Sequence, residues 1–266
     1  EIERQTVALA KELRVVGLMN IQFAVKDGVV FILEVNPRAS RTAPFVSKAT
    51  GVPLPRLATQ VMLGKTLKEL DPWSMRRSGY VSVKESVFPF RRFPGVDILL
   101  GPEMRSTGEV MGIAPTFEEA FLKGQWGAGQ KLPEGGKVFL SVNDRDKRFV
   151  AEVRQYVDLG FELLATSGTA GLLAGQGIPS TRVLKVYEGR PNIVDLIKNG
   201  EVSLVINTAS GKRTAHDSKA IRQATLHYGV PYSTTLSGAK AIARAIGAAR
   251  TTEVRVKSLQ EYYKGE

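Results

Sequence analysis

Residues 29–41, VVFILEVNPRASR, join an apolar run to a group of side chains that could do chemistry. Glu34 offers a carboxylate and Asn36 an amide, and Arg38 and Arg41 follow within a few positions. The β-branched and apolar residues before them predict a strand. A second apolar run, LMNIQFAV at 18–25, precedes it across the turn Lys26-Asp27-Gly28, and this pattern predicts a β-hairpin.

Pairing within such a hairpin brings Gln22 toward the end of the second strand that carries Glu34 and Asn36. These three oxygen ligands suit Mg²⁺ or Mn²⁺ that holds nucleotide phosphates, with water and phosphate completing an octahedron. Arg38 and Arg41 would neutralise the charge that builds on a transferred phosphoryl group. The alternative is an ordinary strand end, with Pro37 breaking the strand and the arginines in solvent.

Composition limits the chemistry that the chain can do. The 266 residues include no cysteine and only two histidines, which excludes disulfides and leaves a zinc site short of ligands. No apolar run reaches the roughly 18 residues of a membrane span, and the first residues predict an amphipathic helix rather than a signal peptide. We therefore expect a cytoplasmic protein with no membrane partner. The net charge of +11, without a dense basic stretch, favours phosphorylated small molecules over nucleic acid.

The chain is long enough for two domains, and the glycine-rich segment 124–136 suggests the boundary, giving domains at 1–130 and 131–266. The first shows a helix at 2–16, the hairpin, helical patterns at 42–51 and 54–67, a strand at 80–90 and a helix at 115–123, an α+β pattern. From residue 137, strands alternate with helices, and this predicts an α/β domain with a parallel sheet. Its strands are expected at 137–142, 161–166, 181–186 and 203–208.

Small hydroxyl, amide and cationic residues lie at the ends of these four strands. Ligands of parallel sheets collect beyond the carboxyl ends of the strands, where helix N-termini, hydroxyls and lysines can bind phosphate. Each loop alone is more simply a helix cap, but four at one edge favour a phosphate site. The candidate residues are Ser141, Lys147, Thr166, Thr169, Lys185, Asn207 and Thr208.

The run NIQFAV at 20–25, followed by FILEVNPRASRTAPFVSKATGVPL at 31–54, resembles the metal-binding hairpin of ATP-grasp enzymes. The continuation KESVFPFRRFPGVDILLGPEMRSTGEVMG at 84–112 resembles the carbamoyl-phosphate synthetase large subunit. The likeness covers essentially the whole chain. It implies the C-terminal portion of the carbamoyl-phosphate ATP-grasp domain, followed by a Rossmann-like, parallel-sheet, methylglyoxal-synthase-like allosteric domain.

This resemblance implies a ligase that uses ATP to phosphorylate carbamate for pyrimidine and arginine biosynthesis. Gln22, Glu34 and Asn36 would then hold the metal and ATP, and Arg41 would contact phosphate. The implied partners are the remainder of the large subunit and a glutaminase small subunit that supplies ammonia, in an oligomer of heterodimers. The nucleotide-binding lobe of the ATP-grasp fold would lie before Glu1, so we expect this chain to be inactive alone.

The resemblance also implies regulation. The second domain would bind uridylate or inosinate at the seven candidate phosphate residues, with Ala209 in place of a threonine of some relatives. Methylglyoxal synthase has a catalytic aspartate near segment 189–195, where this chain has Arg190 and Asn192, which disfavours a lyase. Some bacterial members bind ornithine, and the matching residues are Glu85, Tyr232 and Thr234. An interdomain salt bridge and a half-buried interface aromatic are the alternative roles of Glu85 and Tyr232.

Two other functions stay open on the sequence. One is a stand-alone regulatory module that binds nucleotide monophosphates, with the first half as a docking remnant. The other is a different ATP-grasp ligase, such as a biotin carboxylase, with an unrelated tail. The phosphate site predicted in the second half argues against the latter.

Overall fold

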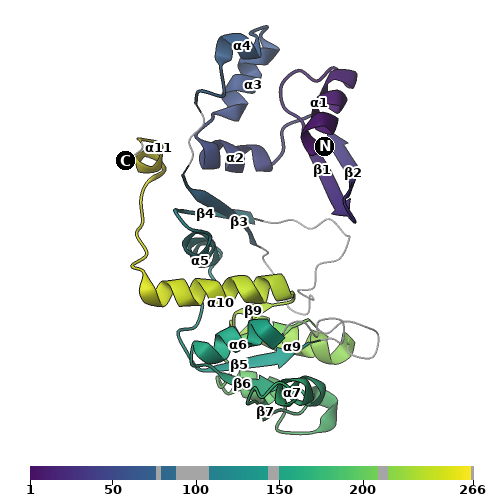
Figure 1. The fold of residues 1–266 in the computed structure, drawn as a ribbon, viewed down its shortest axis with the longest axis vertical. Helices are drawn as coiled ribbons and strands as arrows, with labels where there is room; N and C mark the ends of the chain where they lie inside the picture. Colours follow the sequence, from purple (N-terminus) through teal and green to yellow (C-terminus); the bar gives the residue numbers. More distant parts are fainter. Residues whose placement is uncertain (76–78, 88–107, 143–149, 209–214, 265–266) are drawn as a thin grey trace. The chain divides into compact units, whose positions relative to one another are not determined.

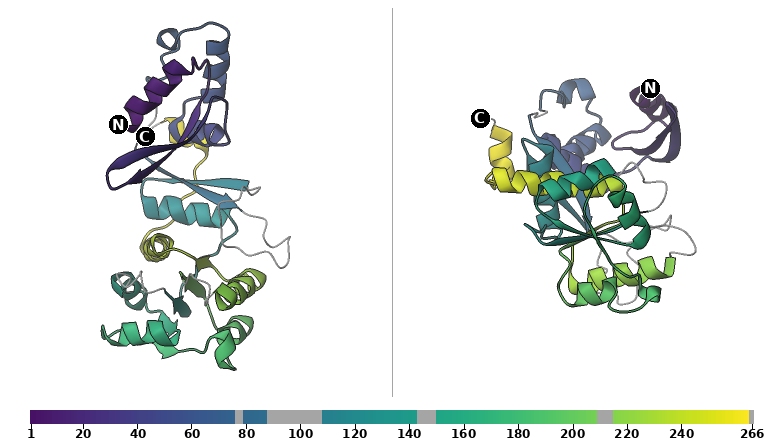
Figure 2. Two further views of the ribbon diagram at one scale, coloured as in Figure 1. Left: turned by 90° about the vertical axis from the view of Figure 1, so that its right-hand side faces the viewer. Right: turned by 60° about the horizontal axis from the view of Figure 1, so that its bottom comes forward.

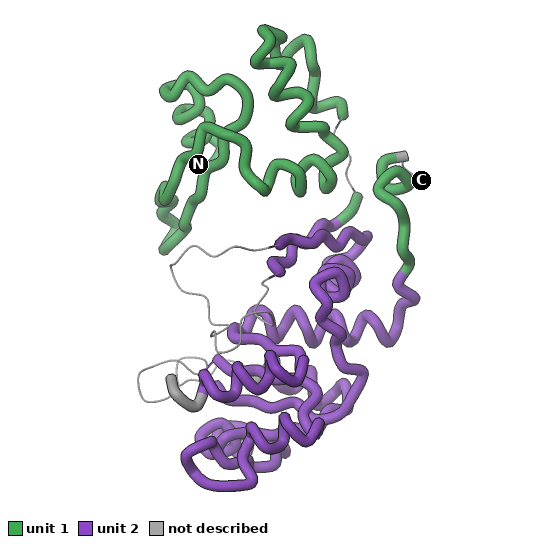
Figure 3. Tube along the Cα trace, turned by 180° about the vertical axis from the view of Figure 1, so that it is seen from behind, with its two compact units in different colours: residues 1–80, 255–266 green, residues 81–254 purple. Residues whose placement is uncertain are grey.

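A computed structural model describes residues 1–266 except 76–78, 88–107, 143–149, 209–214 and 265–266 (Figure 1). The described chain forms two compact units, residues 1–80 with 255–266 and residues 81–254 (Figure 3). This division falls earlier in the chain than the expected boundary at 130, so the two domains at 1–130 and 131–266 stay a prediction. No described helix combines the length and the apolar character needed to cross a lipid bilayer.

The unit of residues 1–80 with 255–266 contains a two-stranded antiparallel hairpin and short helices. The hairpin confirms the sequence prediction, and its turn residues Asp27 and Gly28 both have positive φ angles, of 51° and 78°. The first helix is shorter than expected. Val52, Leu57 and Leu70 pack together in a small core. The elements are α1 (Ile2–Glu12), β1 (Asn20–Lys26), β2 (Val29–Asn36), α2 (Thr42–Thr50), α3 (Leu54–Met62), α4 (Leu67–Leu70) and α11 (Leu259–Lys264).

The unit of residues 81–254 begins with the antiparallel pair β3 (Val81–Val87) and β4 (Gly108–Ala114), which α5 (Phe117–Gly127) packs against. This pair includes the strand expected at 80–90, of which residues 88–90 lie outside the described part. Gly112 on β4 allows the close packing, because a Cβ there would overlap the Ala120 carbonyl oxygen and lie 2.6 Å from the Gly124 nitrogen.

A parallel five-stranded sheet follows, in the order β7-β6-β5-β8-β9. Three of the four expected strands form, and the one expected at 181–186 is much shorter than predicted. Thr181 and Arg182 pair with β6, but the backbone of Leu184 then bridges to Asn192 instead. The strands are β5 (Lys137–Ser141), β6 (Glu162–Ala165), β7 (Thr181–Arg182), β8 (Leu204–Asn207) and β9 (Tyr232–Ser233).

Helices cover both faces of this sheet, as Figure 2 shows. Val138 and Leu140 of β5 pack in a core with α6, α7 and α10, whereas Phe139 between them packs with α8 and α9. Both faces are buried, so the strands are apolar throughout. The helices are α6 (Val150–Asp158), α7 (Ser167–Ala174), the 3₁₀ helix η3 (Val186–Glu188), α8 (Ile193–Lys198), α9 (Ala215–Tyr228) and α10 (Leu236–Thr251).

Candidate functional sites

The hairpin brings the predicted metal ligands together. Gln22 on β1 pairs directly with Glu34 on β2, and the register shifts between Gln22 and Phe23. The Nδ2 atom of Asn36 donates a hydrogen bond of 2.6 Å to Oε1 of Glu34. The Gln22 and Glu34 side chains are exposed, and Asn36 is half-buried. Cross-strand partners share one face of a hairpin, so the three side chains lie on the same side.

The chemistry of these donors fits a hard divalent cation. The amide nitrogen of Asn36 is used in the bond to Glu34, so the atom that Asn36 would offer a cation is its amide oxygen. Across the described residues, no group of three or more His, Cys, Asp or Glu side chains could hold a metal. A site in the hairpin therefore depends on amide oxygens beside the Glu34 carboxylate, a donor set that suits Mg²⁺ or Mn²⁺.

The two arginines lie in the loop that connects this hairpin to α2. The backbone N–H of Arg38 donates to the Asn36 carbonyl at 2.8 Å, which closes a tight turn. Its guanidinium donates to the neighbouring Ala39 carbonyl at 3.1 Å. Arg41 is the N-cap residue of α2. Both side chains are exposed.

Five of the seven candidate phosphate residues meet at the carboxyl edge of the sheet. Ser141 ends β5, Thr166 follows β6, and Asn207 ends β8, and these three strands are neighbours. The Thr208 N–H donates to the Ser141 carbonyl at 3.0 Å. The hydroxyl of Thr169 accepts the Val142 N–H at 3.2 Å. All five side chains are buried, namely Ser141, Thr166, Thr169, Asn207 and Thr208.

Helix α7 starts at this edge with its first backbone N–H groups beyond the strand ends. Thr166 is its N-cap, and the Thr166 hydroxyl bonds to the Thr169 hydroxyl at 3.3 Å rather than capping the helix. The first N–H groups of an α-helix have no partner within the helix. Together with the helix dipole they attract an anion.

Of the two lysines of the predicted phosphate site, the structure describes only Lys185. Lys147 lies outside the described residues, as does Ala209. Lys185 was expected within a strand, but it starts the 3₁₀ helix η3, where its N–H donates to the Glu188 carboxylate at 2.9 Å. Its ammonium lies 5.8 Å from the centre of the Tyr187 ring.

Segment 189–195, near which methylglyoxal synthase would have its catalytic aspartate, makes structural contacts in this chain. The side chain of Asn192 caps α8 by accepting the Val194 N–H at 3.0 Å. Arg190 forms an ion pair with Asp195. Hydrogen bonds from Arg190, and then from the Asn192 N–H, lower the pKa of Asp195 from 3.8 to about 2. A carboxylate held in this way is a weak base.

Glu85, Tyr232 and a residue that sequence reasoning missed form a second polar group. Burial raises the pKa of Glu85 on β3, and a hydrogen bond with Gln125 on α5 partly offsets the rise. Burial also raises the pKa of Tyr232 on β9, and the negative charge of Glu85 adds to it. Thr234 follows two positions later and is half-buried. The expected helix ended before Gln125, so nothing in the sequence singled that residue out.

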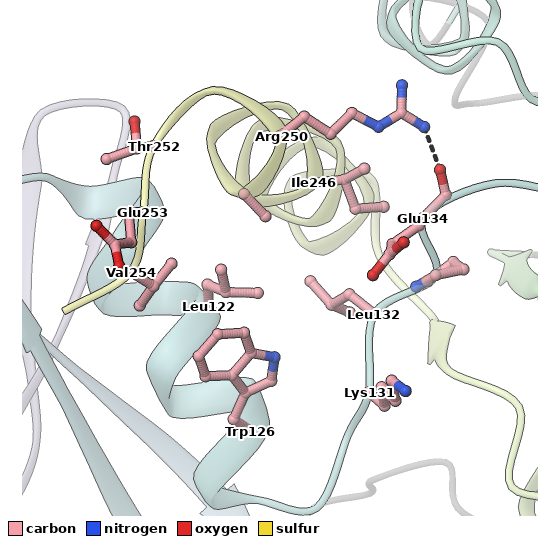
Figure 4. A pocket seen from close by; sticks show the side chains of 12 residues that line it. Leu122, Trp126, Lys131, Leu132, Glu134, Ile246, Arg250, Thr252, Glu253 and Val254 are labelled. Atoms are coloured by element: carbon pink, nitrogen blue, oxygen red, sulfur yellow. Dashed lines mark hydrogen bonds between the residues drawn. The ribbon is translucent and has the colours of Figure 1, made fainter. Parts of the chain in front are cut away.

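A cavity of about 780 Å³ lies elsewhere in the same unit, between the ends of α5 and α10 (Figure 4). Leu122, Trp126 and Ile246 form apolar parts of its wall. Arg250 lies at its edge and donates to the Glu134 carbonyl, as drawn in Figure 4, and to the Leu159 carbonyl at 2.6 Å. The predicted site residues do not line this cavity.

Two family descriptions match the chain. Residues 1–70 match the family described as carbamoyl-phosphate synthase L chain, ATP binding domain, and residues 148–234 match the MGS-like domain. The first segment lies in the unit that contains the hairpin, and the second covers β6 to β9 of the parallel sheet. These matches confirm the predicted fold, an ATP-grasp end followed by a methylglyoxal-synthase-like domain.

The chain is also similar to proteins named carbamoyl phosphate synthase large chain. That of Mesorhizobium japonicum is 53% identical over 99% of this chain and 23% of the relative. That of Myxococcus xanthus is 55% identical over 97% and 24%, and that of Archaeoglobus fulgidus is 52% identical over 97% and 24%. The chain thus spans about a quarter of the length of the curated relatives it matches.

Proposed function

Since the chain belongs to the carbamoyl phosphate synthase large-chain family, we propose that it serves the ATP-dependent phosphorylation of carbamate to carbamoyl phosphate. The observation that carries this proposal is the hairpin geometry. It pairs Gln22 with Glu34 and bonds Glu34 to Asn36, next to a loop with two exposed arginines.

The hairpin residues would hold Mg²⁺ or Mn²⁺ together with the phosphates of ATP. Such a cation supplies positive charge to the phosphate oxygens and orients them. Glu34 contributes the carboxylate, and Gln22 and Asn36 contribute amide oxygens. Arg38 and Arg41 donate hydrogen bonds to the phosphoryl group in transfer, where guanidinium groups match the geometry of phosphate oxygens. Because Gln22 and Glu34 are exposed, nucleotide and cation can approach the hairpin directly.

The parallel-sheet domain would bind a nucleotide monophosphate as an effector. The support is the buried hydroxyl and amide cluster at the sheet edge, together with the start of α7. The N–H groups of Ser167, Gly168 and Thr169 would hold phosphate oxygens, and Lys147 and Lys185 would balance the charge. Uridylate and inosinate are the proposed effectors. Methylglyoxal formation is not proposed, since Arg190 and Asn192 stand in the segment where the resemblance places the catalytic aspartate of methylglyoxal synthase.

We further propose an ornithine site at Glu85, Tyr232 and Thr234. Burial raises the pKa of Glu85, so an ammonium group placed beside it would stabilise its charged form. Gln125 holds the carboxyl group in place through its hydrogen bond. In the complete protein, the remainder of the large chain and a glutaminase small subunit that supplies ammonia would act with this region in an oligomer of heterodimers in the cytoplasm.

The test of the proposed function is the substitution Glu34→Gln in the complete enzyme. The reaction to follow is ATP formation from carbamoyl phosphate and ADP, the reverse of the proposed step. Loss of the carboxylate should lower the rate by about 100-fold or more, because the cation that would neutralise the phosphate charge loses its charged ligand. Glu12→Gln, at an exposed position of α1, is the matched control and should keep the rate. Near wild-type turnover of the Glu34 variant would rule out the assignment.

A further inference from the structure

The segment 252–263, which we name the C-terminal strap, is held at both ends. At its start, Val254 packs against the buried core that contains Leu122 and Ile246, and it lines the cavity of Figure 4. Near its end, Tyr262 is only 4% exposed, and its ring meets the ring of Tyr80 edge to face at 4.8 Å. The first anchor belongs to the unit of residues 81–254 and the second to the unit of residues 1–80 with 255–266.

The middle of the strap is an exposed connector. Residues 253–258 form neither helix nor strand, and Val256 is 88% exposed. The strap follows directly on α10, which ends at Thr251. At its other end α10 starts two positions after Thr234, so one sixteen-residue helix connects the proposed ornithine residues to the strap.

The end of the strap contacts the last turn of α2, the helix that follows the loop of Arg38 and Arg41. The Tyr263 hydroxyl donates a hydrogen bond of 2.8 Å to the Lys48 carbonyl. Lys48 lies in the last turn of α2, where carbonyls have no partner within the helix. The other end of α2 begins at Thr42, directly after Arg41. The helix has no fully buried residue, and the Tyr263 hydrogen bond at its last turn is one of the contacts that fix its position.

We propose that Tyr263 is a positioning residue, which holds α2 and through it the loop of Arg38 and Arg41, while its neighbour Tyr262 anchors the end of the strap on Tyr80. The same proposal has the strap convey ligand binding from the 81–254 unit to this loop. The proposal rests on the proposed function. A short helix moves as a rigid element, so a shift at Lys48 is transmitted to Thr42 at its start, about 9 Å away along the helix axis. Coupling requires an element whose position both sites influence, and the strap is one continuous chain with an anchor in each unit.

The first experiment measures the positioning of α2 in the 266-residue chain itself. Tyr263→Phe removes only the hydroxyl that caps the Lys48 carbonyl. Amide hydrogen exchange in residues 46–52 should become several-fold faster, because the last turn opens more easily. Tyr228→Phe, at an exposed tyrosine of α9, is the matched control and should leave exchange in α2 unchanged. Unchanged exchange in the Tyr263 variant would overturn the positioning role, whatever reaction the complete enzyme performs.

The second experiment slackens the strap while leaving both anchors in place. Insertion of Gly-Ser-Gly-Ser after Val256 adds up to about 13 Å of chain. In the complete enzyme, wild type should show an effector-dependent change in kcat or in the KM for ATP. The insertion variant should bind uridylate, inosinate and ornithine with unchanged Kd, keep its rate without effector, and lose more than half of that change. A full effector response with the longer strap would refute the transmission role.

The two experiments separate this proposal from the proposed function. If the wild-type enzyme makes ATP from carbamoyl phosphate and responds to effectors, but both variants behave as wild type, only the strap proposal fails. If the complete enzyme lacks the reaction, the proposed function fails, and hydrogen exchange of the Tyr263 variant still decides whether the strap positions α2.

Discussion

Glu34 and Gln22 face each other because strand pairing decides which side chains share a face of the hairpin. The shift of register after Gln22 is a local irregularity of the kind that re-aims side chains next to functional sites. The alternation of residues in the sequence predicted the meeting of Gln22, Glu34 and Asn36. It did not predict the register shift, because a shift at a single residue does not change the alternation of apolar and polar residues.

Asp195 gives a prediction on pH-dependent stability. Its pKa is lowered to about 2 in the folded chain, first by the hydrogen bond from Arg190 and then by the Asn192 N–H. A lowered pKa means that the ionised carboxylate favours the folded state above its ordinary pKa of 3.8, and that this contribution is lost as pH falls toward 2. Asp195→Asn should therefore lower the Tm at pH 6, and its difference from wild type should shrink steadily below pH 4. A Tm difference that stays constant from pH 6 to pH 3 would contradict the assigned ion pair.

Between elements, one glycine controls how closely a helix approaches a strand. A Cβ at Gly112 would overlap the Ala120 carbonyl of α5, whereas a Cβ at Gly171 in α7 would meet nothing within 4 Å. Gly112→Ala should destabilise the fold by about 1–3 kcal/mol, because β4 and α5 must separate. Gly171→Ala is the matched substitution and should stabilise it by about 0.4–1 kcal/mol, because alanine favours the helix. Urea unfolding of both variants measures the two free energies, and equal effects would show that α5 does not pack on β4 as described.

Glu85 lies where β3, α5 and β9 contribute side chains, and it gives a second pH-dependent prediction. Burial raises its pKa, so its contribution to stability is fully present below its unfolded pKa and is lost as pH rises through the folded value. Glu85→Gln should therefore raise the Tm at pH 8 and have little effect at pH 4. The same variant should bind ornithine more weakly, since it lacks the charge. A lower Tm at pH 8 would show that the ionised carboxylate has a partner that stabilises it in the free protein.

The sequence predicted an element well where a long run of apolar residues specifies it. It predicted an element poorly where a few backbone hydrogen bonds decide its extent. The apolar runs that became β5, β6 and β8 are buried on both faces and were recognisable for that reason. Residues 181–186 show a similar run, but Leu184 pairs with Asn192 rather than continuing β7. The two-residue strand β9 has no periodicity to detect. Gln125 and the strap tyrosines act through partners distant in sequence, so local patterns could not reveal them.

On the scale of the whole molecule, the hairpin and the parallel sheet belong to different compact units, and their proposed activities should be separable. The chain matches about a quarter of the length of its curated relatives. We therefore expect the isolated 266-residue chain to show no ATP-dependent synthesis of carbamoyl phosphate, because the residues proposed in the hairpin would form only part of a nucleotide site. An assay that follows carbamoyl phosphate formation with ATP, bicarbonate and ammonia checks this. Measurable synthesis would show that the chain is a complete synthetase by itself.

Effector binding, by contrast, should survive in the isolated chain. The buried cluster at the sheet edge and the start of α7 are both formed within the 81–254 unit, and the net charge of +11 favours anionic ligands. Calorimetry should detect uridylate or inosinate with a Kd of roughly micromolar to millimolar. Lys147→Ala should weaken binding by about 1–3 kcal/mol through loss of a charge-assisted hydrogen bond, whereas substitution of the exposed Lys198 of α8 by alanine should not. The same preparation should leave dihydroxyacetone phosphate unconverted, because Arg190 and Asn192 stand in the segment where methylglyoxal synthase would need its catalytic aspartate. Methylglyoxal formation, or nucleotide binding unaffected by Lys147→Ala, would overturn the assignment of an allosteric phosphate site.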